Sequence, residues 1–190
     1  MKGASRGEGL GNKFLGNIRM TDAIVHVVRC FDDDNVIHVE GSTDPVRDMD
    51  TIDLELVMAD LEMVERRIDK AKKAAKGDKK FLQEAADFEG LRDWLNDGKS
   101  ARSYEDVDIA AEYPDCELLS LKPVIYAANL DEDGFSNPES VSYYCQVEQR
   151  AKEQGAQVIP VCAKLEAEIA ELDGEEKKMF LDDLGVAESG

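Results

Sequence analysis

The chain has 190 residues and carries 23 Lys and Arg against 42 Asp and Glu, so its formal net charge is −19. Apolar residues make up 43% of it, which is enough for a folded core and argues against a wholly disordered chain. Such an acidic balance excludes a uniformly basic nucleic-acid binder but not a local basic patch. No apolar run approaches the roughly 18 residues of a membrane span, and residues 1–7 lack the apolar stretch of a signal peptide. We expect a cytoplasmic protein with no membrane partner.

The spacing of apolar residues predicts alternating helices and strands. In chain order we expect a helix at about 8–20, a strand at 23–31, a helical stretch from about 46 to 98, a strand at 123–128, a helix at 138–154, a strand at 157–162, and helices at 164–171 and 174–184. The three strands are nearly continuous apolar runs, as in parallel sheets covered on both faces. The order of elements therefore predicts an α/β fold.

The stretch from about 46 to 98 interrupts this alternation with two long helical patterns. The first has apolar residues three and four apart over three heptads, the spacing of a coiled-coil seam: Leu54, Val57, Leu61, Val64, Ile68, Ala71 and Ala75. The second has its own apolar face: Phe81, Ala85, Phe88, Leu91, Trp94 and Leu95. Asp78 suits the N-cap of this second helix, and Gly98 suits its end. We expect an antiparallel helical hairpin at 45–118, inserted between α/β segments at 1–44 and 119–190.

Residues 66–80 form a basic segment within the acidic chain, with eight Lys and Arg against two Asp and a local charge of +6. This segment is either a solvated helix face or a surface that contacts RNA phosphates, and the sequence leaves both open. No aromatic residue lies within it, so stacking on bases is not indicated. Our candidate RNA contacts are Arg66, Arg67, Lys70, Lys73, Lys76 and Lys80.

Polar residues follow the second and third predicted strands. Asn129 and Glu132 follow the second, and Cys162, Ala163 and Lys164 follow the third. Ligands of an open parallel sheet bind beyond the carboxyl ends of its strands. An Asn amide can donate and accept at a purine edge, a carboxylate can accept from its N–H groups, and backbone N–H groups at a helix start can donate. Each pattern alone is typical of a turn, but together they predict a purine site.

Longer strings of the sequence match one known family: Lys2–Leu15, Asp22–Ile24, His26–Phe31, Asp44-Pro45, Lys122–Val124, Asn129 to Glu132 and Ala163–Ile169. On these residues the chain resembles the YchF-type Obg-like ATPases, a branch of the P-loop GTPases. The resemblance implies a partial P-loop NTPase sheet, the G domain, with the helical hairpin inserted in it.

By this resemblance Asn129, Leu130 and Glu132 form the base-recognition motif, and Cys162, Ala163 and Lys164 form the second base loop. Related GTPases carry Asn-Lys-x-Asp at the first motif. The longer Glu132 and the apolar Leu130 remove that guanine-specific geometry, and the family uses ATP at least as well as GTP, with Mg²⁺. The resemblance also implies association with ribosomes.

The phosphate-binding pattern G-x-x-x-x-G-K-[ST] does not occur in the 190 residues. The Gly-rich segment 7–13 matches the family's switch II region instead. The resemblance therefore implies a middle fragment without the P-loop, the Mg²⁺-binding switch residues or the C-terminal TGS domain. We expect it to bind purine nucleotide as part of a ribosome-associated ATPase, without hydrolysis by this chain alone. The alternatives are a hairpin that serves only as an interaction module, and a gene fragment with no function.

Two further expectations concern thiols and self-association. The cysteines, Cys30, Cys116, Cys145 and Cys162, form no C-x-x-C pair, so we expect reduced thiols and no zinc site. If the sheet is incomplete, its unpaired strand edges would favour self-association.

Overall fold

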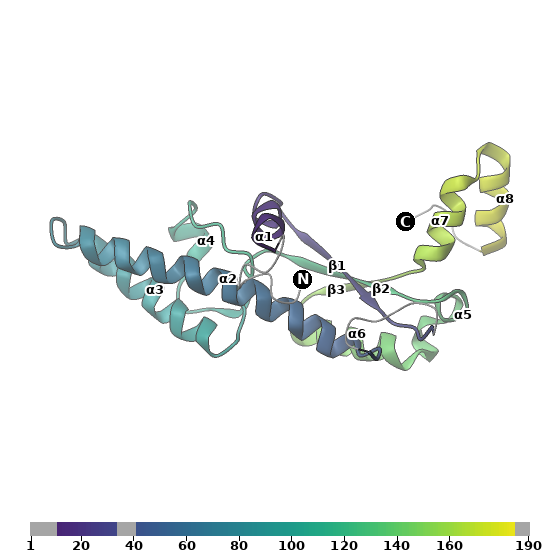
Figure 1. Ribbon diagram of the computed structural model, residues 1–190, viewed down its shortest axis with the longest axis horizontal. Coiled ribbons are helices and arrows are strands. Elements are labelled where there is room, and N and C mark those ends of the chain that lie inside the picture. The colour runs from purple at the N-terminus through teal and green to yellow at the C-terminus, as the bar shows by residue number, and fades with distance from the viewer. Residues whose placement is uncertain (1–10, 34–40, 185–190) are drawn as a thin grey trace. The chain divides into compact units, whose positions relative to one another are not determined.

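The computed structural model describes residues 11–33 and 41–184, and it divides into two compact units (Figure 1). The helical unit comprises Met1–Ile24 and Met49–Pro123. The sheet unit comprises Val25–Asp48 and Val124–Gly190. The division into domains at 1–44, 45–118 and 119–190 stays a prediction. The segment 7–13, matched above to switch II, lies largely outside the described residues.

The sheet has the order β1-β2-β3, formed by β1 (Ile24–Arg29), β2 (Val124–Asn129) and β3 (Gln157–Val161). Strands β2 and β3 are parallel, with Asn129 opposite Val161. Strand β1 runs the same way, because the Ile24 N–H donates to the carbonyl of Pro123 and the Cys30 N–H donates to that of Asn129. The α/β fold with a parallel sheet is confirmed.

One face of the sheet is covered by α6 (Ser142–Glu153), which packs on β2 and β3 (Figure 1). Its residues Tyr144, Val147 and Ala151 are spaced three and four apart, so they share one face, and all three are buried. The ring of Tyr126 on β2 is fully buried as well, and its hydroxyl donates to Gln154 just beyond the helix. Burial of this apolar face is what holds α6 to the strands.

Part of the opposite face is exposed. Val25 and Val27 of β1 are each 61% exposed, and Ile159 of β3 is 45% exposed. Strands β1 and β3 are the outer strands of the described sheet. Exposed apolar outer strands favour pairing with another chain, and self-association of this protein stays a prediction.

The remaining helices include the predicted ones at 8–20, 164–171 and 174–184, and short ones that were not predicted, at 101–103, 109–112 and 132–136. In the sheet unit these are α5 (Glu132–Ser136), the 3-10 turn η2 (Pro138–Ser140), α7 (Ala163–Glu171) and α8 (Gly174–Leu184). In the helical unit they are α1 (Gly11–Arg19), α3 (Phe81–Asn96), the 3-10 turn η1 (Ala101–Ser103) and α4 (Ile109–Glu112). Helix α2 (Pro45–Ala74) begins in the sheet unit and belongs to the helical unit from Met49 onward.

Local chemistry explains where the two long helices begin and end. The Asp44 carboxylate accepts the Arg47 N–H at 3.0 Å, and Pro45 follows it at the first helical position of α2. The N-cap of α3 is Lys80, which makes no side-chain cap hydrogen bond, so Asp78 was wrongly predicted to cap this helix. The Asp78 carboxylate instead accepts the Lys80 N–H at 3.0 Å in the turn before the helix. After α3, Gly98 has φ 76°, a left-handed conformation that glycine adopts without strain.

Helices α2 and α3 form the inserted hairpin through a shared apolar core. Its buried members include Val57, Val64 and Ile68 of α2 and Phe88, Leu91 and Leu95 of α3. The predicted hairpin is therefore confirmed, while a coiled-coil geometry stays a prediction. Leu54 was wrongly placed on the seam, since it is 49% exposed. The first half of α2 instead buries Leu56 and Ala59, in a second cluster with Leu15 and Leu119.

A buried carboxylate ties α2 to the segment that precedes β2. Asp60 is 0% exposed, and its two oxygens accept the N–H groups of Leu119 at 2.8 Å and Ser120 at 2.6 Å. The Ser120 hydroxyl accepts the Ala101 N–H at 3.1 Å, which extends the link to η1. Burial raises the pKa of Asp60, and the two N–H donations only partly oppose that rise. This side chain stabilises the helical unit by satisfying backbone groups that have no access to water.

We expect Asp60→Asn to lower the free energy of unfolding by about 1–3 kcal/mol, because an amide retains one acceptor oxygen and leaves one buried N–H unpaired. Urea denaturation followed by circular dichroism measures this change. The control is Asp69→Asn, which removes the same charge from an exposed position of α2. Equal midpoints for the two variants would contradict the role given to Asp60.

Candidate functional site

Two short loops meet at the carboxyl ends of β2 and β3. The first loop, residues 129–132, follows β2, and the second loop, residues 162–164, follows β3. The Ala163 N–H donates to the Asn129 Oδ1 at 2.9 Å. The Lys164 ammonium forms an ion pair with the Glu132 carboxylate. The structure thus brings four of the predicted site residues into direct contact.

The backbone around Asn129 is held from both neighbouring strands. Its carbonyl accepts the N–H of Cys30, the residue just after β1, at 2.8 Å. The next residue, Leu130, donates its N–H to the carbonyl of Val161 at 2.8 Å, which extends the pairing of β2 with β3 beyond the strand. Within the described part of the chain, the Asn129 amide uses only its oxygen, so its NH₂ group remains available to a ligand.

Glu132 is oriented by the helix that it begins. Asp131 caps α5, since its carboxylate accepts the Gly134 N–H at 2.8 Å. A Cβ at Gly134 would lie 2.8 Å from that same carboxylate oxygen, so any side chain there would displace the cap. Helix α5 therefore starts with a tight turn, and Glu132 projects from its first residue.

The ion pair between the loops is accessible to solvent. The side chain of Lys164 is 71% exposed and that of Glu132 is 47% exposed. The hydrogen bond that Lys164 donates to Glu132, together with the negative charge of Glu132, raises the pKa of Lys164. An exposed pair of this kind contributes little to folding stability, and both partners are within reach of a ligand.

Two of the predicted site residues have buried side chains. Leu130 is 2% exposed and Cys162 is 1% exposed. Their side chains pack in the core of the sheet unit, so only their backbones border the loops. The site that the structure assembles therefore consists of the side chains of Asn129, Glu132 and Lys164 and the backbone at Ala163.

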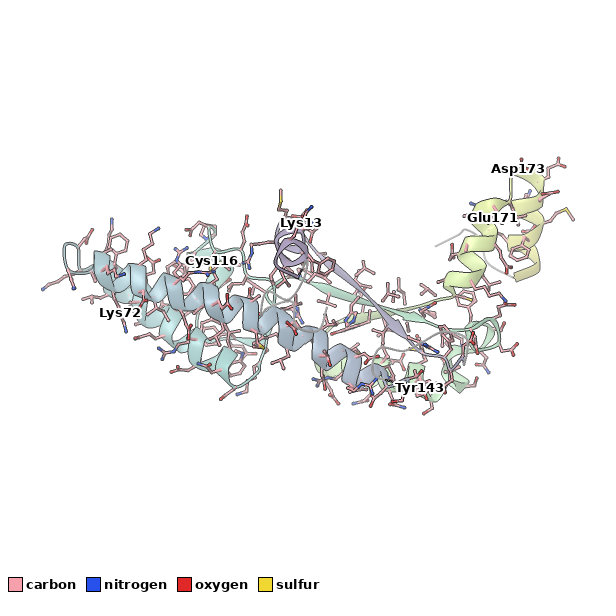
Figure 2. All side chains as sticks on the ribbon, in the orientation of Figure 1. Lys13, Lys72, Cys116, Tyr143, Glu171 and Asp173 are labelled. Atoms are coloured by element: carbon pink, nitrogen blue, oxygen red, sulfur yellow. The ribbon has the colours of Figure 1, made fainter. Side chains whose placement is uncertain are left out.

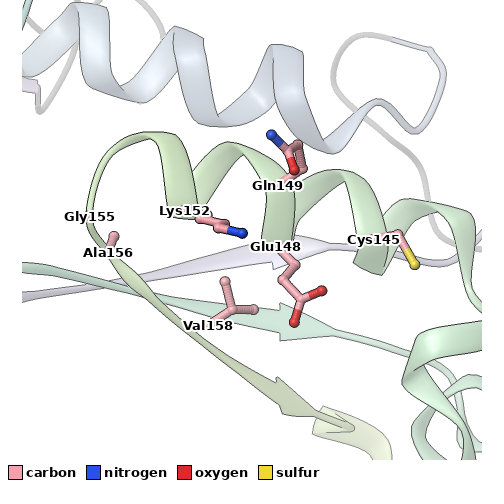
Figure 3. A pocket seen from close by; sticks show the side chains of 7 residues that line it. All are labelled: Cys145, Glu148, Gln149, Lys152, Gly155, Ala156 and Val158. Carbon is pink, nitrogen blue, oxygen red and sulfur yellow. The ribbon is translucent and has the colours of Figure 1, made fainter.

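A groove of about 600 Å³ lies elsewhere in the sheet unit, along α6 and β3 (Figure 3). Its lining residues are Cys145, Glu148, Gln149, Lys152, Gly155, Ala156 and Val158. Neither loop contributes a side chain to it. We do not connect this groove with the purine site.

Metal ligation and thiol chemistry find little support in the described residues. In residues 11–33 and 41–184, no three His, Cys, Asp or Glu side chains are placed to hold a metal ion. All four cysteines are free thiols in the structure. Burial raises the pKa of Cys30 to about 12 and that of Cys116 to about 11, so neither ionises at neutral pH.

Among the helices of residues 11–33 and 41–184, none has the length and apolarity of a membrane span.

The structure separates Arg67 from the other predicted RNA contacts. Its guanidinium donates to Glu84 and to Asp115, each at 2.7 Å. It also lies 5.1 Å from the centre of the Phe88 ring. With 20% of its side chain exposed, Arg67 joins α2 to α3 and to the segment after α4. No local sequence pattern separates Arg67 from the other cations of the segment, because its partners Glu84 and Asp115 are distant in sequence.

The remaining cations of the basic segment are more accessible. Lys72 of α2 is labelled in Figure 2. It pairs with Glu89 of α3, and Lys80 pairs with Asp78 at 3.3 Å. The other cations are exposed and pair with no carboxylate among the residues that the structure describes: Arg66, Lys70, Lys73, Lys76 and Lys79. These five form the exposed basic set of the hairpin.

Comparison with known proteins finds similarity along the whole chain. The chain is 48% identical over 192 residues to the ribosome-binding ATPase YchF of Bacillus subtilis (strain 168), covering 100% of this chain and 52% of that protein. It is 49% identical over 193 residues to the protein of the same name from Haemophilus influenzae (strain ATCC 51907 / DSM 11121 / KW20 / Rd), covering 99% and 52%. No family model matches.

A solved structure shows the same fold. The Schizosaccharomyces pombe YchF GTPase superposes with a TM-score of 0.80 at 33% identity, covering 98% of this chain and 52% of that one. The chain thus spans about half the length of the curated relatives that it matches.

We expect Arg67→Met to lower the free energy of unfolding by about 1.5–3 kcal/mol, because it removes hydrogen bonds between charged groups and leaves Glu84 without its partner. The neighbouring Arg66→Met, at an exposed position, is the matched control and should stay within about 0.5 kcal/mol of the parent. Urea denaturation of both variants measures the difference. A loss of the same size in Arg66→Met would show that Arg67 has no special structural role.

Proposed function

Since this chain belongs to the YchF family along its whole length, we propose that it supplies the purine-recognition loops of a YchF-type nucleotide-binding protein. The observation that carries this proposal is the direct contact between the two loops, through the Asn129–Ala163 hydrogen bond and the Lys164–Glu132 ion pair. The bacterial relatives carry the name ribosome-binding ATPase. For this chain, ATP or GTP and the ribosome are proposed partners, and the cytoplasm is its proposed location.

The proposed recognition uses the groups that the loops leave accessible. The NH₂ group of Asn129 donates to a ring nitrogen of the purine, and the Glu132 carboxylate accepts from a base N–H. The aliphatic stem of Lys164 lies along the flat face of the ring. Because the Asn129 oxygen is bonded to the second loop, the two loops keep a constant spacing before the ligand arrives.

The proposal covers recognition of the base and assigns no hydrolytic step to this chain. The sequence contains no G-x-x-x-x-G-K-[ST] pattern to cradle phosphates. Nor do the residues of the described part offer Mg²⁺ a set of ligands.

We expect the parent chain to bind ATP or GTP saturably in titration calorimetry, and Asn129→Ala and Asn129→Asp to weaken binding at least about tenfold, through the loss of at least one hydrogen bond. Asn129→Asp retains an acceptor for the Ala163 N–H and lacks the NH₂ donor, so it separates base recognition from loop assembly. The control is Asn96→Ala, at an exposed position of α3. Absence of binding by the parent, or unchanged binding by Asn129→Asp, would contradict the proposal.

Ribosome association through the hairpin is a second proposed function, supported by the exposed basic set. Clustered cations on one surface bind RNA phosphates and release counterions. Arg67 is excluded from this surface because its guanidinium is bonded inside the hairpin. If the hairpin binds ribosomes while the loops bind no nucleotide, the chain is an interaction module, which is the alternative function.

We expect the triple variant Arg66→Gln, Lys70→Gln and Lys73→Gln to weaken co-sedimentation with ribosomes, and to reduce the slope of log affinity against log salt by about 2–3. The control variant, Lys13→Gln, Lys152→Gln and Lys178→Gln, removes the same charge from exposed positions outside the hairpin. If both triple variants bind equally, net charge and not the hairpin surface governs the association.

A further inference from the structure

The ion pair between the loops changes what the first loop offers to a base. Glu132 projects from the first residue of α5, and Lys164 projects from the second residue of α7. The Lys164 ammonium donates to the Oε1 oxygen of Glu132, and the Oε2 oxygen accepts no hydrogen bond from the residues that the structure describes. Both side chains are exposed, at 47% and 71% respectively, so a base that reaches Glu132 also reaches Lys164.

We propose that Lys164 sets the base preference of this site, because its ion pair with Glu132 presents one acceptor and one donor side by side, a pattern that matches adenine. This inference rests on the proposed nucleotide function. It assigns to Lys164 a specificity role that goes beyond the contact of its stem with the ring.

The chemistry of the two purines explains the preference. The Watson–Crick edge of guanine presents adjacent N–H donors at N1 and at its 2-amino group. A carboxylate alone has only acceptors, so an unpaired Glu132 would oppose guanine less than the ion pair does, although its length departs from the Asp of related GTPases. The same edge of adenine presents the 6-amino donor beside an acceptor at N1. Adenine therefore needs an acceptor and a donor together, which neither a carboxylate nor an ammonium supplies alone.

The ammonium of Lys164 supplies the donor. It has three N–H groups, and the ion pair with Glu132 leaves the others able to donate to adenine N1. The free Oε2 oxygen of Glu132 accepts from the adenine 6-amino group. Against guanine, the positive charge of Lys164 opposes the two N–H donors that Glu132 would otherwise accept.

The surrounding residues keep the pair in place. The Asp131 cap fixes the start of α5, from which Glu132 projects. On α7, Glu168 lies one turn after Lys164 and adds a second negative charge that favours the ammonium form. The hydrogen bond between Asn129 and Ala163 holds the start of α7 beside the first loop. The pairing therefore follows from the backbone arrangement of both loops.

The test compares the dissociation constants for ATP and GTP, measured by titration calorimetry on the parent chain, Lys164→Met and Lys164→Arg. We expect Lys164→Met to shift the ratio of the two constants toward GTP by about tenfold or more, which corresponds to about 1.4 kcal/mol. Lys164→Arg keeps a donor beside Glu132 and should retain most of the parent's preference. The control is Lys79→Met, which removes one positive charge from an exposed position of the helical unit and should leave the ratio of the two constants unchanged.

A double variant tests the pattern of donor and acceptor directly. A Gln side chain carries one acceptor oxygen and an NH₂ donor on the same group. We therefore expect Glu132→Gln, combined with Lys164→Met, to move the preference back toward ATP relative to Lys164→Met alone. This recovery would not occur if Lys164 only supported the fold of the loops.

The outcomes separate this inference from the proposed function. In one outcome, the parent chain binds both nucleotides and Lys164→Met weakens both equally or leaves both unchanged, so that the ratio of the ATP and GTP dissociation constants is unchanged. In that case the specificity role of Lys164 is wrong and the nucleotide function stands. If the parent chain binds neither nucleotide, both are wrong. A shift of the ratio toward GTP in Lys164→Met, with recovery in the double variant, supports both.

Discussion

The parallel pairing of β2 and β3 is the constraint on which the candidate site depends. Because the two strands run the same way, with Asn129 opposite Val161, the loops that follow them begin at the same edge of the sheet. The Leu130 N–H continues the pairing past the strand ends, so the first loop starts from a fixed backbone. A shift in register by one residue would turn Asn129 to the other face and separate it from Ala163. The contacts between the loops therefore follow from the sheet.

Side chains that bond to backbone groups connect segments far apart in sequence. Asn129 accepts from Ala163 in the sheet unit, and Asp60 accepts from Leu119 and Ser120 in the helical unit. In each case a polar side chain satisfies N–H groups of a loop that has no strand partner of its own. The two side chains differ in what remains accessible. Asp60 is buried and only stabilises the fold, whereas Asn129 retains an NH₂ group that can bind a ligand.

The cations of the hairpin likewise fall into a structural group and an exposed group. The guanidinium of Arg67 pairs with Glu84 and Asp115, and it lies over the ring of Phe88. The exposed basic set has no such partners within the described residues, so its charges remain accessible to solvent. A segment with a local charge of +6 therefore contains both a structural cation and candidate RNA contacts. Counting charges along the chain does not separate the two.

The sequence alone determined the parallel α/β sheet, the inserted hairpin and the pair of loops, because apolar spacing reports which face of each element is buried. Its resemblance to one family identified the same loops. Only the tertiary structure decided which side chains meet. Leu54 follows the seam spacing yet is exposed, since the first half of α2 packs against Leu15 and Leu119 with another face. Arg67 and Asp60 look like exposed helix charges until partners distant in sequence are placed beside them. The ion pair of Lys164 with Glu132 joins residues 32 positions apart, and no local pattern specifies it. Periodicity describes one element at a time, whereas these contacts depend on how elements pack together.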